Sequence, residues 1–246
     1  MRRGKLPFPP DPLSSSVTAA SPPSRTSAAR WATFDCYGTL IDWNLGIRTE
    51  LERLFGVEVA PRLLERYHEL EHGLEAETYR TYHQVLTLAL EQLAHDESIQ
   101  LPEGEAGALA RSLPDWPPFP EVPPALAELR HRGWKLAILS NTDRDLIAAS
   151  ERQLGVPVDL AIVAEDVESY KPAKAHWERF FEVTTADHDH HVHVAASLFH
   201  DIRPARELGL RSVWINRLGE TADPEPDREL TDLSDLPDTL EALVPS

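Results

Sequence analysis

Short apolar runs that end on a polar residue constrain the fold of this chain more than any other feature. Five runs have the length of buried strands, at residues 31–34, 136–139, 160–164, 192–196 and 212–215. Helical patterns lie between the later runs, at residues 122–132, 143–154, 172–181 and 203–208. Because strands that alternate with helices form parallel sheets with right-handed crossovers, we predict a doubly wound α/β sheet.

The segment between the first two predicted strands breaks this alternation. Residues 44–116 contain helical patterns only, at residues 45–55, 61–74, 79–94 and 105–113. An insert of roughly 70 residues is too long for an ordinary connection, so we interpret it as a helical cap domain over the carboxyl edge of the sheet. Residues 30–43 and 117–246 then form the α/β core domain, and the proline-rich segment 114–120 leads the chain back into it.

Residues 1–29 differ in composition from the rest of the chain. They are rich in Pro, Ser and Ala, and Asp11 is their one acidic residue. Such a composition predicts a disordered N-terminal extension. A transit peptide, which is also rich in Arg and Ser and poor in acids, is the alternative.

The composition of the whole chain excludes some classes of partner. Its net charge of -17 disfavours binding to nucleic acid and to anionic membranes. No apolar run approaches the ~20 residues that cross a bilayer. The one cysteine, Cys36, rules out an internal disulfide and suits a reducing compartment, so we expect a cytoplasmic protein. A small anionic substrate stays compatible with this charge, because cations within a cleft can outweigh it locally.

Polar side chains follow four of the predicted strands: Asp35, the pair Ser140 and Asn141, Lys171, and Asp201. Because the carboxyl ends of parallel strands meet at one edge, where α/β proteins bind ligands, we expect these side chains to lie close together. A carboxylate beside a cation can act as a covalent nucleophile, and Lys171 would keep Asp35 ionised. Ser140 could bind a substrate anion, and Asp201 could orient Lys171, position a water molecule or ligate a metal ion.

Each of these residues also has a plainer interpretation. Asp35 before Gly-Thr suits a turn, and Lys171 suits a solvated surface charge. Ser140 with Asn141, and separately Asp201, suit the first positions of helices. The functional interpretation therefore depends on the joint placement of all of them.

The four segments together resemble the signature motifs of a known family. They are Asp-Cys-Tyr-Gly-Thr-Leu at 35–40, Leu-Ala-Ile-Leu-Ser-Asn at 136–141, Tyr-Lys-Pro at 170–172, and the loop that holds Asp201. In this order they resemble the haloacid dehalogenase superfamily, and most of all the L-2-haloacid dehalogenases. Segments 119–123 and 213–217 fit the same pattern. The resemblance implies a Rossmann-like core with an inserted helical cap.

The resemblance also implies a mechanism that needs no cofactor. Asp35 attacks the α-carbon of a small 2-haloalkanoic acid, displaces halide with inversion and forms an ester that water hydrolyses. Lys171 stabilises charge in the first step, Asp201 helps to place the water, and Thr39 binds developing oxyanion charge. Ser140 and Asn141 are then substrate-binding residues. By the same resemblance, a homodimer forms through the cap helices.

The cap is implied to supply a halide acceptor and part of an apolar wall. Arg66, in Arg-Tyr-His-Glu-Leu-Glu at 66–71, matches the cap arginine of the family in its spacing to Leu-Glu. The alternative for Arg66 is a surface residue paired with Glu69 or Glu71. The apolar wall around the halogen-bearing carbon is assigned to Tyr37, Tyr67, Leu70 and Trp177.

A magnesium-dependent phosphatase of the same superfamily is the alternative function. Asp35 and Asp201 would then hold Mg²⁺. Such phosphatases usually carry a second Asp where this chain has Tyr37, and commonly an acid where it has Ser197. The chain also departs from the dehalogenase pattern, with Ala196, Leu198 and Trp177 where Ser, Asn and Tyr are usual. These departures affect groups that support the substrate or water.

Overall fold

The computed structural model describes residues 1, 29–184 and 186–245 and contains one six-stranded parallel sheet. The strand order is β3-β2-β1-β4-β5-β6. The strands are β1 (Trp31–Phe34), β2 (Lys135–Ser140), β3 (Leu160–Val163), β4 (His191–Ala195), β5 (Arg211–Ile215) and β6 (Arg228–Leu230). All five predicted strands are therefore confirmed, with small shifts at their ends. The sequence pattern missed β6 because this edge strand has three residues and is mostly exposed.

The central strand, β1, determines where the site lies. Its four residues are buried, and Phe34 pairs with Ile138 of β2 and with Val194 of β4. The strand order reverses between β1 and β4, which is the position where doubly wound sheets bind ligands. The loops that follow β1, β2 and β4 therefore leave the sheet at the same edge.

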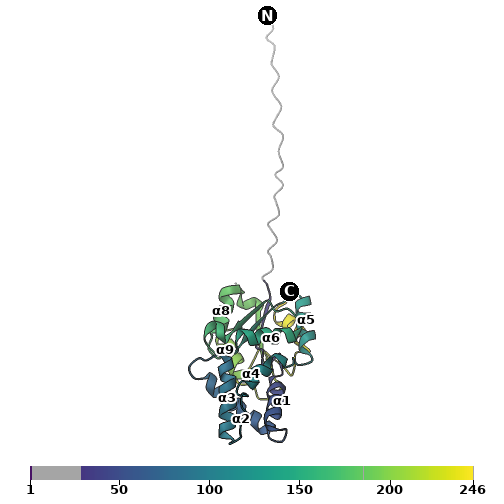
Figure 1. Cartoon of the computed structure of the whole chain (residues 1–246). Coiled ribbons are helices and arrows are strands. Elements are labelled where there is room, and N and C mark those ends of the chain that lie inside the picture. The colour runs from purple at the N-terminus through teal and green to yellow at the C-terminus, as the bar shows by residue number, and fades with distance from the viewer. Residues whose placement is uncertain (2–28, 185, 246) are drawn as a thin grey trace.

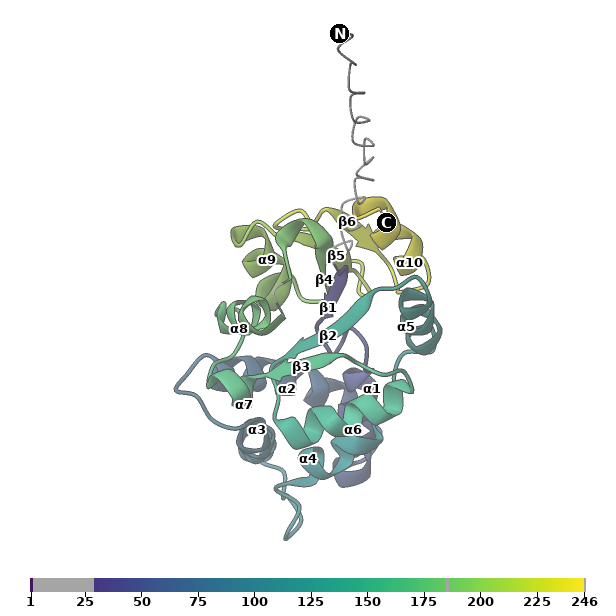
Figure 2. The same ribbon diagram turned by 90° about the horizontal axis from the view of Figure 1, so that it is seen from above.

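Helices cover both faces of the sheet, as Figure 2 shows. One face carries α5 (Val122–His131), α6 (Arg144–Leu154) and α10 (Leu236–Leu243). The other carries α8 (Ala175–Thr184) and α9 (Arg203–Glu207), and the short helix α7 (Ala164–Val167) follows β3. Helix α8 begins three residues later than predicted, because residues 172–174 form a turn.

Four further helices lie between β1 and α5 in the chain and gather at the carboxyl edge of the sheet (Figure 1). They are α1 (Trp43–Phe55), α2 (Ala60–Glu75), α3 (Tyr82–Asp96) and α4 (Ala108–Ser112), with a 3₁₀ turn at Leu113–Asp115. These four helices and this turn are together called the cap. Helix α4 is shorter than predicted because Gly104 and Gly107 disfavour helix at its start. The division into two domains at residues 44 and 116 stays a prediction.

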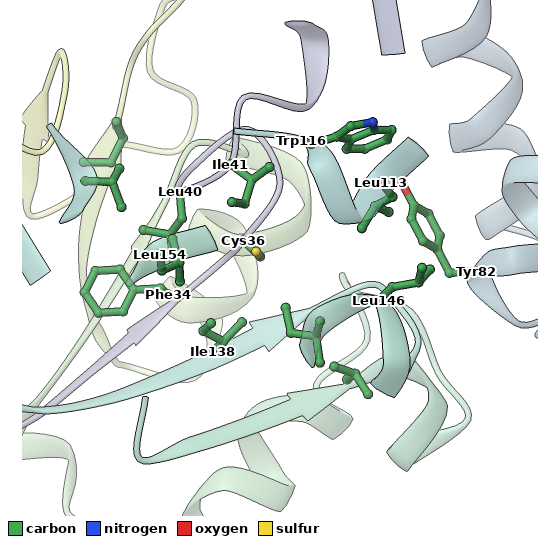
Figure 3. Packing of buried hydrophobic residues seen from close by; sticks show 14 of the residues in the cluster. Phe34, Cys36, Leu40, Ile41, Tyr82, Leu113, Trp116, Ile138, Leu146 and Leu154 are labelled. Carbon is green, nitrogen blue, oxygen red and sulfur yellow. The ribbon is translucent and has the colours of Figure 1, made fainter. Parts of the chain in front are cut away.

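One hydrophobic cluster joins these four helices to the sheet. Figure 3 shows Phe34 and Ile138 of the sheet with Leu113, Trp116 and Tyr82 on the cap side. The outgoing and returning segments also pair, since Phe119 N–H donates to the Leu40 carbonyl at 3.0 Å.

Asp143, in the loop after β2, connects that loop to α3 by hydrogen bonds. Its carboxylate accepts from the backbone N–H groups of Tyr82 at 2.9 Å and His83 at 2.8 Å. These are first-turn donors that the helix itself leaves unpaired, so a buried core carboxylate caps a helix of the insert.

Two expectations concern the whole chain. The predicted disordered extension lies almost entirely outside the described residues, because residues 2–28 are not described. Within the part of the chain that the structure describes, no helix is both long and apolar enough to span a membrane.

Candidate active site

Asp35, Lys171 and Asp201 form a buried charged cluster at the carboxyl edge of the sheet. Asp35 follows β1, and Asp201 lies in the single π-helical turn Leu198–Ile202 that follows β4. The Lys171 Nζ donates to Asp35 Oδ1 at 2.9 Å and to Asp201 Oδ1 at 2.6 Å. It also donates to the carbonyl oxygen of Leu139 in β2 at 2.8 Å. The structure thus brings these three predicted residues together around one ammonium group.

Thr39 holds the other oxygen of Asp35. Its hydroxyl donates to Asp35 Oδ2 at 2.7 Å and accepts from the Ala196 backbone N–H at 2.8 Å. Gly38 makes the turn between Asp35 and Thr39 at a φ of 86°, a conformation that favours glycine. The Asp35 carboxylate therefore has one donor on each oxygen, which fixes its orientation.

Burial and neighbouring charges act differently on the three ionisable groups. Burial raises the pKa of Asp35 against the opposing charge of Lys171, and Asp201 adds to the rise. Burial would also raise the pKa of Asp201, but Lys171 and His193 lower it to about 2. Burial disfavours the charged form of Lys171, yet the two carboxylates raise its pKa above the usual value. Lys171 and Asp201 are therefore charged at neutral pH.

A chain of buried side chains supports Asp201. His193 Nε2 lies 3.0 Å from Asp201 Oδ1, and His193 Nδ1 lies 2.8 Å from Thr33 Oγ1. Thr33 Oγ1 also lies 2.8 Å from His191 Nε2. Alternate residues of a strand share one face, so both histidines of β4 reach the same Thr of β1. The sequence motifs gave His193 no role, although the alternation of His and Val at residues 191–194 was the available signal.

A cavity of about 310 Å³ lies between this cluster and the cap helices. Ser140 borders the cavity, and its buried Oγ has no hydrogen-bond partner among the described residues. This hydroxyl is therefore a donor that its protein neighbours leave unused. Asn141 Oδ1 accepts from the Lys171 backbone N–H at 2.7 Å, and its Nδ2 donates to Glu75 Oε2 at 3.1 Å. The lining residues come from both sides: Asp35, Tyr37, Trp43, His68, Glu71, His72, Glu75, Tyr82, Ser140, Asn141, Lys171, Ser197, His200 and Asp201.

Helix α2 contributes a row of polar side chains to this cavity: His68, Glu71, His72 and Glu75. Their spacing of three or four residues places them on one helix face. Glu71 Oε1 accepts from the Tyr82 hydroxyl at 2.6 Å, and burial raises the pKa of Glu71 to about 7. None of these four residues was predicted as part of the site, and the spacing was the signal that could have identified them.

Comparison with known proteins identifies the family of this chain. Residues 29–209 match the family model of haloacid dehalogenase-like hydrolases. The chain belongs to this family. It is 30% identical over 208 residues to an (S)-2-haloacid dehalogenase of Pseudomonas sp. (strain YL), which covers 81% of this chain and 89% of that protein. It is 28% identical over 195 residues to haloacetate dehalogenase H-2 of Moraxella sp. (strain B), with 77% and 87% covered.

A solved structure of the family has the same fold. It is the L-2-haloacid dehalogenase of Xanthobacter autotrophicus with chloropropionic acid covalently bound. The TM-score is 0.77 at 20% identity, with 87% of this chain and 98% of that chain covered. The similarity confirms the predicted α/β architecture of this family member.

Arg66, the implied halide acceptor, does not border the cavity in the described part of the chain. It lies nine residues before Glu75, or about 2.5 helical turns, and so projects from the opposite side of α2. Its side chain is 39% exposed and pairs with Glu69 at 2.5 Å and Asp96 at 3.0 Å. Arg66 thus forms the surface ion pair with Glu69 that was the alternative interpretation. It does not place a cation at the cavity in this structure.

Three residues assigned to the apolar wall are also absent from the described cavity lining. Tyr67 is buried within the cap, with its hydroxyl 3.5 Å from Glu71 Oε1, and Leu70 packs against the main hydrophobic cluster. Trp177 is buried in α8, where its ring lies 5.2 Å from that of His193. These side chains face the packed interior because each helix adopts the rotation about its axis that buries its apolar side chains.

Tyr37 does border the cavity. Its hydroxyl lies 3.0 Å from Ser150 Oγ, and its ring stacks on Tyr82 at 6.2 Å. Burial raises the pKa of Tyr37 above the usual value. Tyr37 therefore offers an apolar surface and is a poor acid.

Proposed function

We propose that this chain is a hydrolase of the (S)-2-haloacid dehalogenase type, with Asp35 as nucleophile. The observation that carries the proposal is the Asp35 carboxylate held between Lys171 and Thr39 at the floor of a small cavity. The predicted catalytic roles of Lys171, Asp201 and Thr39 are part of this proposal. The relatives named as 2-haloacid and haloacetate dehalogenases support it.

In the first step, an Asp35 oxygen attacks C2 of the haloacid and halide leaves with the bonding electron pair. Ser140 Oγ supplies a free donor for the substrate carboxylate, and Tyr37 borders the reacting carbon with an apolar surface. Lys171 opposes the rise in the Asp35 pKa that burial causes and orients the carboxylate, which is a positioning and electrostatic contribution. Attack opposite the leaving group inverts the configuration at C2.

In the second step, water attacks the ester carbonyl of Asp35 and releases the 2-hydroxy acid. Asp201 Oδ2 is buried without a partner among the described residues, whereas Oδ1 is bound by Lys171 and His193. Oδ2 is therefore available to accept a hydrogen bond from the water. Lys171 and Thr39 each face an oxygen of the Asp35 carboxyl group, where negative charge develops during this attack.

The phosphatase alternative has less support from the site. Lys171 donates to Oδ1 of both Asp35 and Asp201, and Thr39 donates to Asp35 Oδ2. Of these four carboxylate oxygens, Asp201 Oδ2 alone lacks a partner among the described residues, which is few ligands for a divalent cation. Tyr37, with its raised pKa, is a weak replacement for the carboxylic acid that would protonate an alkoxide. We therefore propose catalysis without a cofactor. A small anionic substrate, a cytoplasmic location and a homodimer stay predictions.

Halide release from (S)-2-chloropropionate in EDTA tests the proposal. We expect metal-independent release of chloride and (R)-lactate, with at least a ~1000-fold loss in Asp35→Asn because a neutral amide is a far weaker nucleophile than a carboxylate. Asp42→Asn is the matched control, since Asn replaces Asp well at the start of α1. Phosphate release from a phosphate ester with Mg²⁺, without any halide release, would overturn the proposal.

A further inference from the structure

Two histidines and a threonine are buried at the centre of the sheet, where apolar side chains would fill the same space. Thr33 of β1 and His191 and His193 of β4 are each 0% exposed. The histidines alternate along β4 with Val192 and Val194, so they share one face of the strand. Burial of a polar group costs free energy unless the group is hydrogen-bonded. Packing alone therefore does not account for the two histidines.

A line of hydrogen bonds through these three side chains ends on Asp201. Because Asp201 is a carboxylate, His193 Nε2 is the donor in their contact, which joins Nε2 to Oδ1 at 3.0 Å. His193 Nδ1 lies 2.8 Å from Thr33 Oγ1, and Thr33 Oγ1 lies 2.8 Å from His191 Nε2. A hydroxyl can donate to one imidazole and accept from another, so Thr33 holds both rings. The His193 ring is thus held at both of its nitrogens.

Aromatic side chains of α8 cover the two histidines. The Trp177 ring lies 5.2 Å from that of His193, at an angle of 71°. The rings of Phe180 and Phe181 each lie 5.2 Å from that of His191. Such apolar surroundings lower the local dielectric constant and so strengthen the hydrogen bonds within them. His193 is therefore a rigidly held donor to Asp201.

His193 and Lys171 donate to the same oxygen of Asp201 and leave the other oxygen unused. Both bind Oδ1, at 3.0 Å and 2.6 Å. Oδ2 is buried and has no partner among the described residues. Two donors on one oxygen restrict rotation of the carboxylate, which keeps Oδ2 in place as an acceptor for water. Without His193, the carboxylate could turn about its contact with Lys171.

The Asp35 carboxylate is held without help from His193. Its two oxygens are bound by Lys171 and Thr39. The Lys171 Nζ is held in turn by the Leu139 carbonyl at 2.8 Å, as well as by Asp201. In the described part of the chain, His193 forms hydrogen bonds with Thr33 and Asp201 and none with Asp35. Loss of His193 should therefore affect Asp201 far more than the nucleophile.

We propose that His193 is a positioning residue for ester hydrolysis, which holds the Asp201 carboxylate so that Oδ2 orients the attacking water. This proposal rests on the proposed dehalogenase function. The water oxygen bonds to the carbonyl carbon of the Asp35 ester, and the ester C–O bond breaks with its electron pair on the oxygen of the 2-hydroxy acid. One water proton ends on that oxygen, and the other is lost to solvent, which restores the Asp35 carboxylate. His193 exchanges no proton in this step.

Substitution of His193 by Gln or Asn separates the roles of its two nitrogens. The side-chain amide of Gln can take the place of Nε2, whereas that of Asn reaches only as far as Nδ1. His193→Gln therefore keeps a donor to Asp201, and His193→Asn and His193→Leu lose it. We expect ester hydrolysis to slow roughly 10–100-fold in the Asn and Leu variants and to stay within about 3-fold of wild type in the Gln variant.

Single-turnover reaction of excess enzyme with (S)-2-chloropropionate in EDTA measures the two steps separately, as release of chloride and of (R)-lactate. Chloride release should stay within about 3-fold of wild type in all three variants. The Asp35 ester should accumulate in the Asn and Leu variants, where intact-protein mass spectrometry detects it. In the steady state, kcat and KM should fall together with kcat/KM retained, because kcat/KM reports the steps up to halide release. A merely structural role would lower kcat/KM as well.

The matched control is His131→Asn at the end of α5, where the side chain is 84% exposed, and both steps should be unchanged there. The Asn and Leu variants both lack the donor, so the test stays decisive where one of them folds poorly. Three results would each overturn the role of His193 and leave the dehalogenase function intact: equal loss of chloride and lactate release, unchanged lactate release without the donor, or a Gln variant as slow as the Asn variant. Absence of chloride release from the wild-type enzyme would overturn both.

Discussion

At the scale of single residues, the site depends on side chains that serve two neighbours at once. Thr39 is such a residue, because its buried hydroxyl connects the Asp35 carboxylate with the backbone N–H of Ala196. Ala196 lies directly after β4, so this hydroxyl joins the loops after two neighbouring strands. Its loss would leave a buried N–H and a charged oxygen without a partner.

We therefore expect Thr39→Val, which keeps the shape of the side chain, to lower the free energy of unfolding by about 1–3 kcal/mol. The rate of halide release should fall with it, since one Asp35 oxygen is no longer held. Urea unfolding together with chloride release measures both effects. Thr39→Ser keeps the hydroxyl and should retain most of both, and equal losses in the two variants would contradict the assignment.

At the scale of elements, two helical glycines of the cap have opposite surroundings. Gly46 in α1 lies against Trp116 of the returning segment, and a Cβ added there would overlap the indole ring. A Cβ added to Gly73 in α2 would have no described atom within 4 Å beyond its chain neighbours and the backbone of its own helix. Helix α1 can thus approach the returning segment only where a side chain is missing.

The same substitution should therefore have opposite effects at these two positions. Gly46→Ala should destabilise the protein by about 1–3 kcal/mol, because overpacking outweighs the gain in helix propensity. Gly73→Ala should stabilise it by about 0.5–1 kcal/mol through propensity alone. Urea unfolding midpoints of the two variants provide the comparison, and a shift of the same sign in both would disprove this account of the packing.

At the scale of the whole molecule, stability is linked to the protonation of the cap interior. Glu71 is 6% exposed, and its carboxylate accepts from a tyrosine hydroxyl of α3. Burial raises its pKa to about 7, whereas a glutamate in the unfolded chain titrates near 4.3. Between these values the folded protein binds a proton that the unfolded chain lacks, so stability falls as the pH rises.

We expect the free energy of unfolding to fall by on the order of 2–3 kcal/mol between pH 5 and pH 8 because of this group. Glu71→Gln, which is neutral at every pH, should make the observed decrease smaller by about this amount, and buried groups such as Glu75 account for the rest. Urea unfolding at the two pH values measures it, with Glu65→Gln as the exposed control. The same decrease in wild type and in Glu71→Gln would show that another group is responsible.

Local patterns were sufficient to predict most of the fold and half of the site. The runs of β1 to β5 are largely buried and contain mostly apolar residues, with His and Val alternating in β4, so local patterns identify them. Strand β6 is too short and too exposed to be recognised. Asp35 and Lys171 could be predicted to meet because the ends of parallel strands share one edge. The contact between His193 and Asp201 was harder to predict, because it depends on how the π-helical turn after β4 folds back over the strand.

The sequence by itself determined the doubly wound sheet, the helical insert and the meeting of Asp35, Lys171 and Asp201. Only the tertiary structure decided which side of α2 faces the nucleophile. Leu63 and Tyr67 bury against the rest of the cap, and this packing turns Glu71 and Glu75 toward the cavity. Arg66 was expected at the site because its spacing matches a family motif, but it lies on the surface. The rotation of a helix about its axis depends on contacts with neighbouring helices, and the spacing of a motif does not specify those contacts.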